Sequence, residues 1–258
     1  MNNRLELFAF YSNFSLSKEC IDSGIDGIVI DWENSSKRMR QSLYNTQVNL
    51  HSEKELIEAR KINSASIICR VNGGVHLSND EISKALDLGA DYIMVPMIKS
   101  LEDVEKALKA IDNKCKSVLM IETQESVKLV NSLKNYPVDK IYVGLNDLAI
   151  SRNCNNIFLP FADGTIDHIR EQVTAKFGVA GLTHSASGYP IPCHLLIDEL
   201  KRIKCDFTFL RRSFYRDIKD YSIEEIILSI HDRFSKEAIH SQSKELKDLI
   251  NSISQPLI

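Results

Sequence analysis

The sequence predicts an α/β protein: a (β/α)8 TIM barrel with an extra C-terminal helix, built as a single domain over residues 1–258. Short apolar, β-rich runs alternate with amphipathic helical stretches along the whole chain, a pattern typical of a parallel sheet. Eight such strand–helix units are present, the number that closes into a barrel. No Gly-rich phosphate turn follows an early strand, as an open doubly wound sheet would usually show.

The strand segments are six or seven residues long and rich in Ile, Val, Leu, Phe and Tyr. Gly or Asp residues before most of them mark the end of the preceding helix or turn. The predicted strands are residues 5–11, 26–32, 66–72, 91–97, 117–123, 140–145, 178–184 and 206–212.

Helix boundaries carry their own signals. Ser52 with Glu55 and Ser78 with Glu81 have the spacing of a capping box, in which each side chain bonds an amide of the first turn. Gly89 can adopt the left-handed conformation that ends a helix before the next strand. The tail, about residues 222–258, has apolar residues at helical spacing and predicts one or two further helices. We expect part of it to pack on a neighbouring subunit of a homo-oligomer.

Composition excludes several classes of function. The 258 residues are 43% hydrophobic with a formal charge of −3, so one sizeable core is expected and an electrostatic case for nucleic acid is weak. Six scattered cysteines without CxxC spacing and an N-terminus without a signal pattern indicate a cytoplasmic protein. No apolar run approaches the roughly 18 residues that would cross a membrane.

Polar residues gather at the predicted carboxyl ends of the strands, where barrel enzymes place their active sites. Strand-end residues are therefore the candidates for chemistry. They are Asp31, Glu33, Arg70, Asn72, Glu122, Asn146, Asp147, His184, Arg211 and Arg212.

Glu122 and Asp147 end neighbouring strands, so their carboxylates can converge above the barrel. Two hard oxygen ligands with room for water and substrate suit Mg²⁺ or Mn²⁺, whereas zinc would favour His or Cys, and no histidine lies near either residue in sequence. The alternative is that Glu122 is an ion-paired residue at the rim of the core.

Five segments together resemble the HpcH/HpaI aldolase and citrate lyase family. They are IVIDWEN, CRVNG, GADYIMVPMIKSLEDVEKA, LMIETQESV and DKIYVGLNDLAIS, in the order and spacing of that family over roughly residues 24–151. The resemblance implies that Glu122 and Asp147 hold a divalent metal. It also implies that Arg70 binds the oxygen of a pyruvate-like or acyl enolate.

The residue types fit such a reaction. Cleaving a carbon–carbon bond beside a carbonyl leaves an enolate, whose developing negative charge a metal ion and the Arg70 guanidinium can stabilise. The backbone amides of residues 145–147, at a predicted helix start, can bind the substrate carboxylate, so Leu145 and Asn146 are substrate-binding candidates. Asn72, near Arg70, is another. Pleat alternation sends either Arg211 or Arg212 inward toward an anionic group of the substrate.

Two positions depart from the aldolase pattern. Asn34 stands where such aldolases usually carry a proton-transfer histidine, and Met120 stands where they tend to have Gln. Both departures favour the citrate lyase branch, although no basic strip for the phosphates of CoA is evident. Asparagine cannot act as a general base. The missing base could be replaced by metal-bound hydroxide, by His184 or by a residue of a neighbouring subunit. Glu33 is a candidate to contact metal-bound water.

These features predict a metal-dependent carbon–carbon lyase that acts on a small hydroxy or oxo acid through the enolate of a 2-oxo acid. One alternative is a citryl-CoA or malyl-CoA-like acyl-CoA lyase. Another is a metal-binding barrel without catalysis. The candidate catalytic residues are Arg70, Glu33, Asn34 and His184.

Overall fold

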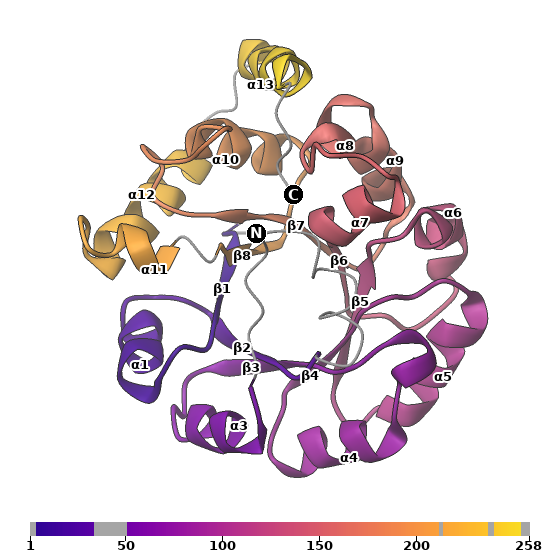
Figure 1. The fold of residues 1–258 in the computed structure, drawn as a ribbon. Helices are drawn as coiled ribbons and strands as arrows, with labels where there is room; N and C mark the ends of the chain where they lie inside the picture. Colours follow the sequence, from indigo (N-terminus) through magenta and orange to yellow (C-terminus); the bar gives the residue numbers. More distant parts are fainter. Residues whose placement is uncertain (1–3, 34–50, 212–213, 237–239, 254–258) are drawn as a thin grey trace.

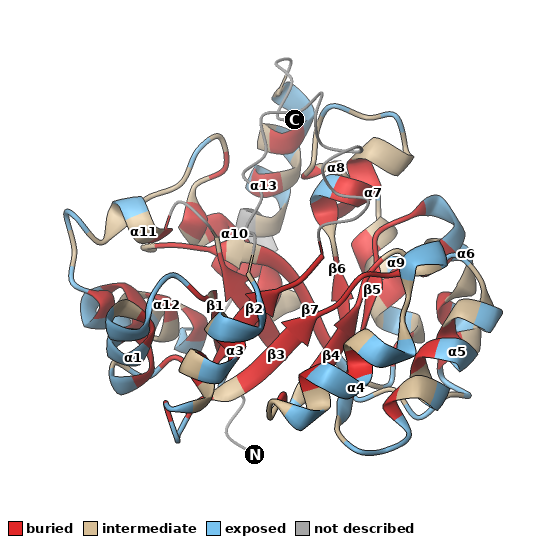
Figure 2. Ribbon diagram, turned by 60° about the horizontal axis from the view of Figure 1, so that its bottom comes forward, coloured by how far each residue is buried: buried red, intermediate tan, exposed pale blue. Residues whose placement is uncertain are grey.

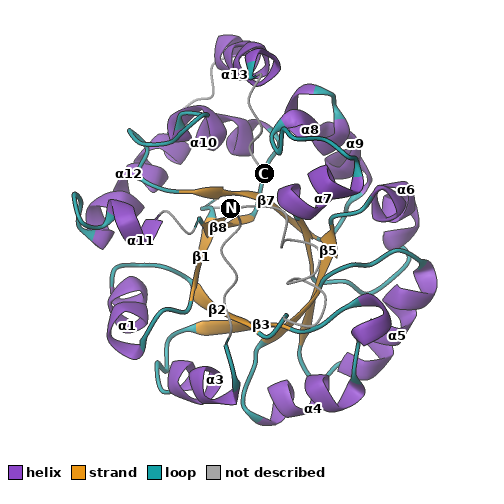
Figure 3. Cartoon of the chain, in the orientation of Figure 1, coloured by secondary structure: helices purple, strands orange, loops and turns teal. Residues whose placement is uncertain are grey.

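The computed structural model describes residues 4–33, 51–211, 214–236 and 240–253, and there eight parallel strands close into a barrel in sequence order. Figures 1 and 3 look along the barrel, with the strands as an inner ring and the helices outside. The predicted (β/α)8 barrel is confirmed. The strands are β1 (Glu6–Phe10), β2 (Gly27–Asp31), β3 (Ser66–Arg70), β4 (Tyr92–Val95), β5 (Lys116–Ile121), β6 (Lys140–Val143), β7 (Lys176–Leu182) and β8 (Phe207–Leu210).

The helices alternate with the strands and form the outer layer. A 3₁₀ turn, η1 (Gly74–His76), follows β3. The α-helices are α1 (Phe14–Asp22), α3 (Glu53–Arg60), α4 (Asn79–Asp87), α5 (Leu101–Ile111), α6 (Gln124–Leu133), α7 (Leu145–Ser151), α8 (Leu159–Ala162), α9 (Thr165–Gln172), α10 (Cys193–Arg202), α11 (Phe214–Asp217), α12 (Ile223–Ser235) and α13 (His240–Ser252).

Two apolar layers hold the barrel together. The larger layer lies between the strands and the ring of helices, and Figure 2 shows the strands buried while the outer faces of the helices are exposed. The smaller layer fills the barrel itself and combines aromatic side chains with Met and with the branched aliphatic side chains that are usual there. Strand residues alternate between the two layers because successive side chains point to opposite faces. The inner layer contains Phe8, Val29, Ile68, Met94, Val118, Met120, Tyr142, Phe207 and Phe209.

A charged cluster closes the amino end of the barrel. Lys140, the first residue of β6, is fully buried, and its Nζ lies 5.1 Å from the ring centroid of Phe8 and 4.6 Å from that of Phe207. It forms an ion pair with Glu6, which also pairs with Lys176. Burial lowers the pKa of Lys140, and Glu6 opposes that shift. This end of the barrel is therefore structural and lies opposite the carboxyl ends of the strands.

Strand β7 carries an irregularity near its end. Its pairing with β8 shifts between Gly178 and Gly181, and Ala180 within the shift has a φ of +65°. The Ala180 carbonyl accepts hydrogen bonds from the Tyr142 hydroxyl (2.5 Å) and the Thr208 hydroxyl (3.2 Å). These two bonds stabilise a backbone conformation that a residue with a Cβ rarely adopts.

The predicted helix signals are mostly confirmed. Ser52 and Glu55 form the full capping box at the start of α3, and Gly89, with a φ of +91°, follows α4. The box predicted for Ser78 forms only in half. The Ser78 hydroxyl accepts the Glu81 amide (3.4 Å), but the Glu81 carboxylate bonds Asn72 in the loop after β3 instead.

The tail forms two helices. Helix α12 packs on α10 and α1, and α13 packs on α10 and α8 of the same chain, outside the ring in Figure 1. The exchange of this tail with a neighbouring subunit stays a prediction. No helix among the described residues has both the length and the apolar character needed to cross a bilayer.

Candidate active site at the carboxyl ends of the strands

Arg70, at the end of β3, is held by two acids from the end of β2. Its Nε and Nη2 donate to the two carboxylate oxygens of Asp31 at 2.9 and 2.7 Å, and a Glu33 oxygen lies 3.5 Å from Nε. The side chain is 9% exposed, and the guanidinium lies over the Phe10 ring at 5.7 Å. Burial works against the charged form, but Asp31 and Glu33 outweigh it and raise the pKa of Arg70.

One terminal nitrogen of this arginine stays available. Among the residues with described positions, Nη1 of Arg70 has no hydrogen-bond acceptor, whereas Nε and Nη2 are both engaged. A guanidinium held in place on one edge can present its other edge to a ligand without losing further side-chain entropy. Asp31 therefore orients Arg70.

Glu122 follows β5 and points into the barrel mouth. It is 2% exposed, and its Oε1 accepts the backbone N–H of Met97 at 2.8 Å. Met97, just after β4, has a φ of +57°, so a strained residue supplies this donor. On the other side, a Cβ placed on Gly144 would lie 2.5 Å from Oε2 of Glu122. A side chain at position 144 would therefore force the Glu122 carboxylate to shift.

Asp147 lies in the first turn of α7, which begins directly after Gly144. A carboxylate at this position is stabilised by the positive end of the helix dipole. The pKa of Glu122 is raised to about 8, first by burial, then by the negative charges of Asp147 and Glu33. The structure thus brings the two predicted metal ligands into electrostatic contact, as their places on neighbouring strands required.

These two acids fit a hard divalent cation. Within residues 4–33, 51–211, 214–236 and 240–253, no group of three or more His, Cys, Asp or Glu side chains has the arrangement of a metal site. A zinc centre built from several protein ligands is therefore not found there. Mg²⁺ usually takes one or two carboxylates and fills its other positions with water and substrate oxygens, which matches the donors present.

The start of α7 and the end of β8 carry the predicted substrate-binding residues. No side chain caps α7 at Gly144, Asn146 is exposed and Leu145 is buried. Arg211 follows β8 directly, and its backbone N–H donates to the Leu182 carbonyl at 2.9 Å. All three residues lie at the carboxyl ends of the strands, as the sequence predicted. Their roles stay predictions.

Two other candidates form contacts of a structural kind. The side-chain amide of Asn72 donates to Glu81 (2.8 Å) and to the Trp32 carbonyl (3.3 Å), so these contacts tie the loop after β3 to α4 and β2. The His184 ring stacks on Tyr221 with a centroid distance of 3.9 Å. None of the contacts found for His184 joins it to Glu122 or Arg70. Catalysis by His184 stays a prediction that this packing does not support.

Asn34, predicted at the proton-transfer position, lies outside the described residues, as does Arg212. Sequence reasoning missed Met97 because no residue-type signal predicts a positive φ at a methionine. It also missed the aromatic floor of the mouth, where Tyr142 stacks on Phe209 at 4.3 Å and Phe10 meets Phe209 at 5.7 Å. The inward alternation on β1, β6 and β8 was the signal that could have predicted that floor.

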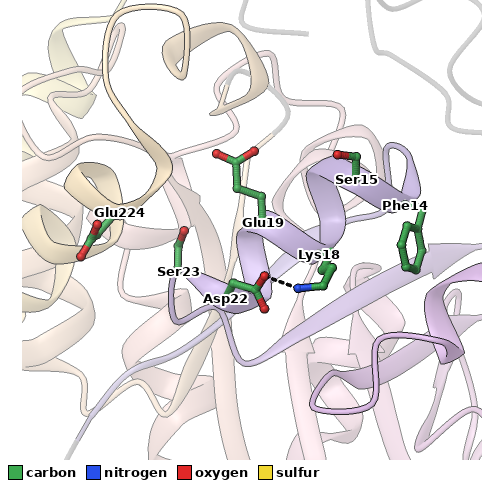
Figure 4. Close-up of a pocket in the computed structure, with 7 residues that line it drawn as sticks. All are labelled: Phe14, Ser15, Lys18, Glu19, Asp22, Ser23 and Glu224. Atoms are coloured by element: carbon green, nitrogen blue, oxygen red, sulfur yellow. Dashed lines mark hydrogen bonds and ion pairs between the residues drawn. The ribbon is translucent and has the colours of Figure 1, made fainter.

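A surface cavity of about 470 Å³ lies on the outside of the ring, along α1 and the start of α12 (Figure 4). Its charged lining includes the exposed Lys18–Asp22 pair, one helical turn apart. None of the predicted site residues lines it. We place the site at the barrel mouth, because the buried acids and the arginine gather there.

Comparisons with known proteins agree with the fold and the motifs. The chain resembles the solved HpcH/HpaI aldolase from Desulfitobacterium hafniense DCB-2, with a TM-score of 0.64 and 11% identity over 87% of this chain and 93% of that one. It also resembles RipC from Yersinia pestis, with a TM-score of 0.58 and 13% identity over 92% and 98%. At this identity, the two structures show the fold alone. The comparison with curated protein sequences returns no match.

The family follows from the sequence match. Residues 4–156, more than half of the chain, match the model of the HpcH/HpaI aldolase/citrate lyase family. That segment contains the charged residues that the barrel mouth brings together, which are Asp31, Glu33, Arg70, Glu122 and Asp147. The chain belongs to the HpcH/HpaI aldolase/citrate lyase family.

Proposed function

We propose that this protein is a divalent-metal-dependent carbon–carbon lyase that acts on a small hydroxy or oxo acid through the enolate of a 2-oxo acid such as pyruvate. The observation that carries the proposal is the Glu122–Asp147 pair. Burial and the negative charges of Asp147 and Glu33 raise the pKa of Glu122 to about 8, so a divalent cation bound by these carboxylates would stabilise their charged forms. Family members are typically dependent on a divalent metal, which agrees with this pair.

Glu122 and Asp147 would hold Mg²⁺ or Mn²⁺. When bound, the ion would act as a Lewis acid on the carbonyl of the substrate. The Met97 amide fixes one oxygen of Glu122, and Gly144 leaves the other uncrowded, so the carboxylate is positioned before any ligand arrives. Such preorganisation avoids reorganisation during the reaction.

Arg70 supplies the second positive charge. In the cleavage direction, the bond between the carbon next to the carbonyl and the carbinol carbon breaks, and its electron pair forms the enolate. The negative charge then develops on the carbonyl oxygen, for which Nη1 of Arg70 is a free donor among the described residues. Because Asp31 holds Nε and Nη2, the donor is aimed in advance.

Cleavage also needs a base for the carbinol proton and an acid for the enolate carbon. The proton leaves the hydroxyl as the aldehyde forms, and one proton returns to the carbon of the enolate. We propose Glu33 for this transfer, because it is buried beside Arg70 and acts on the pKa of Glu122. The backbone amides at the start of α7, at Leu145 and Asn146, are proposed to bind the carboxylate of the 2-oxo acid.

The test is exchange of the methyl protons of pyruvate with solvent, followed by NMR in D₂O. We expect exchange with Mg²⁺ or Mn²⁺, loss of exchange in EDTA, and loss in Glu122→Gln and Asp147→Asn. Glu125→Gln, an exposed glutamate three residues further on, is the matched control and should behave as wild type. Exchange that persists in EDTA, or at wild-type rate in Glu122→Gln, would contradict the proposed site.

Two other outcomes separate the alternatives. Turnover of an acyl-CoA without pyruvate exchange would favour a citryl-CoA or malyl-CoA-like lyase. Binding of oxalate or pyruvate in the presence of Mg²⁺, with no exchange and no turnover, would favour a barrel that binds metal without catalysis.

A further inference from the structure

Arg211 is an arginine whose side chain has no hydrogen-bonding or ion-pairing partner among the described residues. Its Nε is buried, and neither a hydrogen bond nor an ion pair from its guanidinium is found anywhere in the described part of the chain. Desolvating an N–H of a charged group without an acceptor is costly. Among the described residues, only Arg211 and His231 have a buried side-chain nitrogen without a hydrogen-bond partner. An acceptor that arrives with a ligand would offset that cost.

The strand geometry points this side chain into the barrel mouth. Phe207 and Phe209 of β8 face the barrel interior, and Arg211 continues that alternation two residues further on. A Cβ on Gly181 of the neighbouring strand would lie 3.1 Å from the Cβ of Arg211. The absence of a side chain at Gly181 therefore leaves the space that Arg211 occupies.

The protein groups around Arg211 do not neutralise it. Cys193 lies close enough for the charge of Arg211 to lower the pKa of its thiol. Burial has the larger effect and raises that pKa to about 11, so the thiol stays neutral. Asp217, which also acts on Cys193, accepts the hydroxyl of Thr183 and forms no ion pair with Arg211 among the described residues. The positive charge of Arg211 is thus available to a ligand in the mouth.

The aromatic floor links the strand that precedes Arg211 with Arg70. The Arg70 guanidinium covers the Phe10 ring at 5.7 Å, the Phe10 ring meets Phe209 at 5.7 Å, and Arg211 follows Phe209 by two residues. Arg70 ends β3, the two acids follow β5 and β6, and Arg211 follows β8, so one or two strands lie between these three places around the barrel. All three groups thus belong to the carboxyl end of the same barrel, where the active sites of such barrels lie.

We infer that Arg211 binds a carboxylate carried by the electrophile that the enolate attacks, and so selects anionic over neutral aldehydes; this inference rests on the proposed function. In the synthetic direction, the enolate carbon bonds to the aldehyde carbon. The aldehyde oxygen then takes a proton and becomes a hydroxyl, while the enolate oxygen becomes the carbonyl of the 2-oxo acid again. The carboxylate at Arg211 is unchanged. Arginine matches a carboxylate through two parallel hydrogen bonds.

A carboxylate suits this position better than the phosphates of CoA. Arg211 follows directly on β8, two residues after Phe209, which belongs to the aromatic floor. The pantetheine arm of an acyl-CoA places its phosphates far from the reacting carbonyl. A carboxylate on a short aldehyde lies within a few bonds of it.

The experiment compares pairs of aldehydes of equal length with pyruvate and Mg²⁺: glyoxylate with acetaldehyde, and 4-oxobutanoate with butanal. In Arg211→Gln, we expect kcat/KM to fall at least tenfold for the two anions and less than twofold for the two neutral aldehydes. Exchange of the pyruvate methyl protons should stay within twofold of wild type. Arg211→Lys should recover part of the loss, and Arg4→Gln, at the amino end of β1, is the control.

Equal losses for charged and neutral aldehydes, or no loss, would overturn the inference. A lower affinity for acetyl-CoA in Arg211→Gln, with the anionic aldehydes unaffected, would also overturn it. Absence of pyruvate exchange in the wild type would instead remove the proposed function. Calorimetric binding of 4-oxobutanoate then decides the role of Arg211: at least tenfold weaker binding in Arg211→Gln supports it, and equal binding refutes it.

Discussion

The guanidinium of Arg70 and the carboxylate of Asp31 form a buried two-bond pair that joins the ends of β3 and β2, with N–O distances of 2.9 and 2.7 Å. The two residues are paired in strand register as well, so backbone and side-chain contacts coincide. The pair fixes the orientation of the arginine while one guanidinium nitrogen remains available to a ligand.

Replacing Asp31 should affect both stability and function. Asp31→Asn removes the charge that matches a buried guanidinium, and breaking a buried pair in this way costs about 3–5 kcal/mol. We expect the free energy of unfolding in urea to fall by that order, and pyruvate exchange to fall as well. Asp112→Asn, at an exposed aspartate, should change stability by less than about 1 kcal/mol. An Asp31→Asn protein as stable and active as wild type would show that the pair does not position Arg70.

Glu122→Gln should stabilise the metal-free protein while abolishing exchange. Burial and Asp147 raise the pKa of Glu122 from 4.5 to about 8. The folded state then keeps a proton that the unfolded chain releases, so stability falls as the pH rises from about 4.5 to 8. Glutamine carries no charge to desolvate. In EDTA, we expect its advantage over wild type to grow by about 1 kcal/mol or more between pH 5 and pH 8.

Urea unfolding at several pH values in EDTA measures this advantage. An advantage that is constant with pH would show that Glu122 does not titrate in this range. With saturating Mg²⁺, the order should reverse, because only the wild type gains binding energy from the ion.

His51 should make the protein lose stability more steeply as the pH falls below neutral. Its Nδ1 accepts the backbone N–H of Asp31 at 2.9 Å, which requires an unprotonated nitrogen. Burial lowers its pKa below 6.5, against the opposing charge of Asp31. The unfolded state therefore binds a proton more readily, and stability is lost as the pH falls through and below about 6.5.

His51→Asn keeps an acceptor near the position of Nδ1 and cannot titrate. We expect its melting temperature to fall less than that of wild type between pH 7 and pH 5. His168→Asn, at an exposed histidine, should follow wild type across that range. If wild type and His51→Asn lose stability in parallel, then His51 is not the group responsible.

The charged cluster at the amino end predicts an asymmetry between its members. Glu6→Gln leaves Lys140 buried without its anion and should cost about 3–5 kcal/mol. Lys140→Met leaves Glu6 paired with the half-exposed Lys176, and methionine suits the aromatic surroundings. We expect Lys140→Met to be close to neutral and the double variant to recover most of the loss, as measured by urea unfolding. Pyruvate exchange should be unchanged in Lys140→Met, since this end lies opposite the active site.

Local patterns determined much of this protein. The strand segments, the capping box at Ser52 and Glu55, and the helix end at Gly89 depend on a few consecutive residues, so the sequence was enough to predict them and the closed barrel. The electrostatic contact between Glu122 and Asp147 was also predictable, because these residues follow consecutive strands, and parallel strands bring their carboxyl ends to one edge. Their role as metal ligands stays a prediction.

Contacts between distant segments were decided only by the tertiary structure. Asp31 and Arg70 are 39 residues apart in sequence, and their pairing depends on the register of β2 against β3. The positive φ of Met97, the gap at Gly144 and the bulge at Ala180 depend on neighbours brought by other strands. The strand alternation left open which of Arg211 and Arg212 faces the barrel interior. Because Phe207 and Phe209 pack inward, the same alternation directs Arg211 inward. Sequence carries the local preferences of a chain, whereas close approach in space selects which polar groups satisfy one another and which stay free for a ligand.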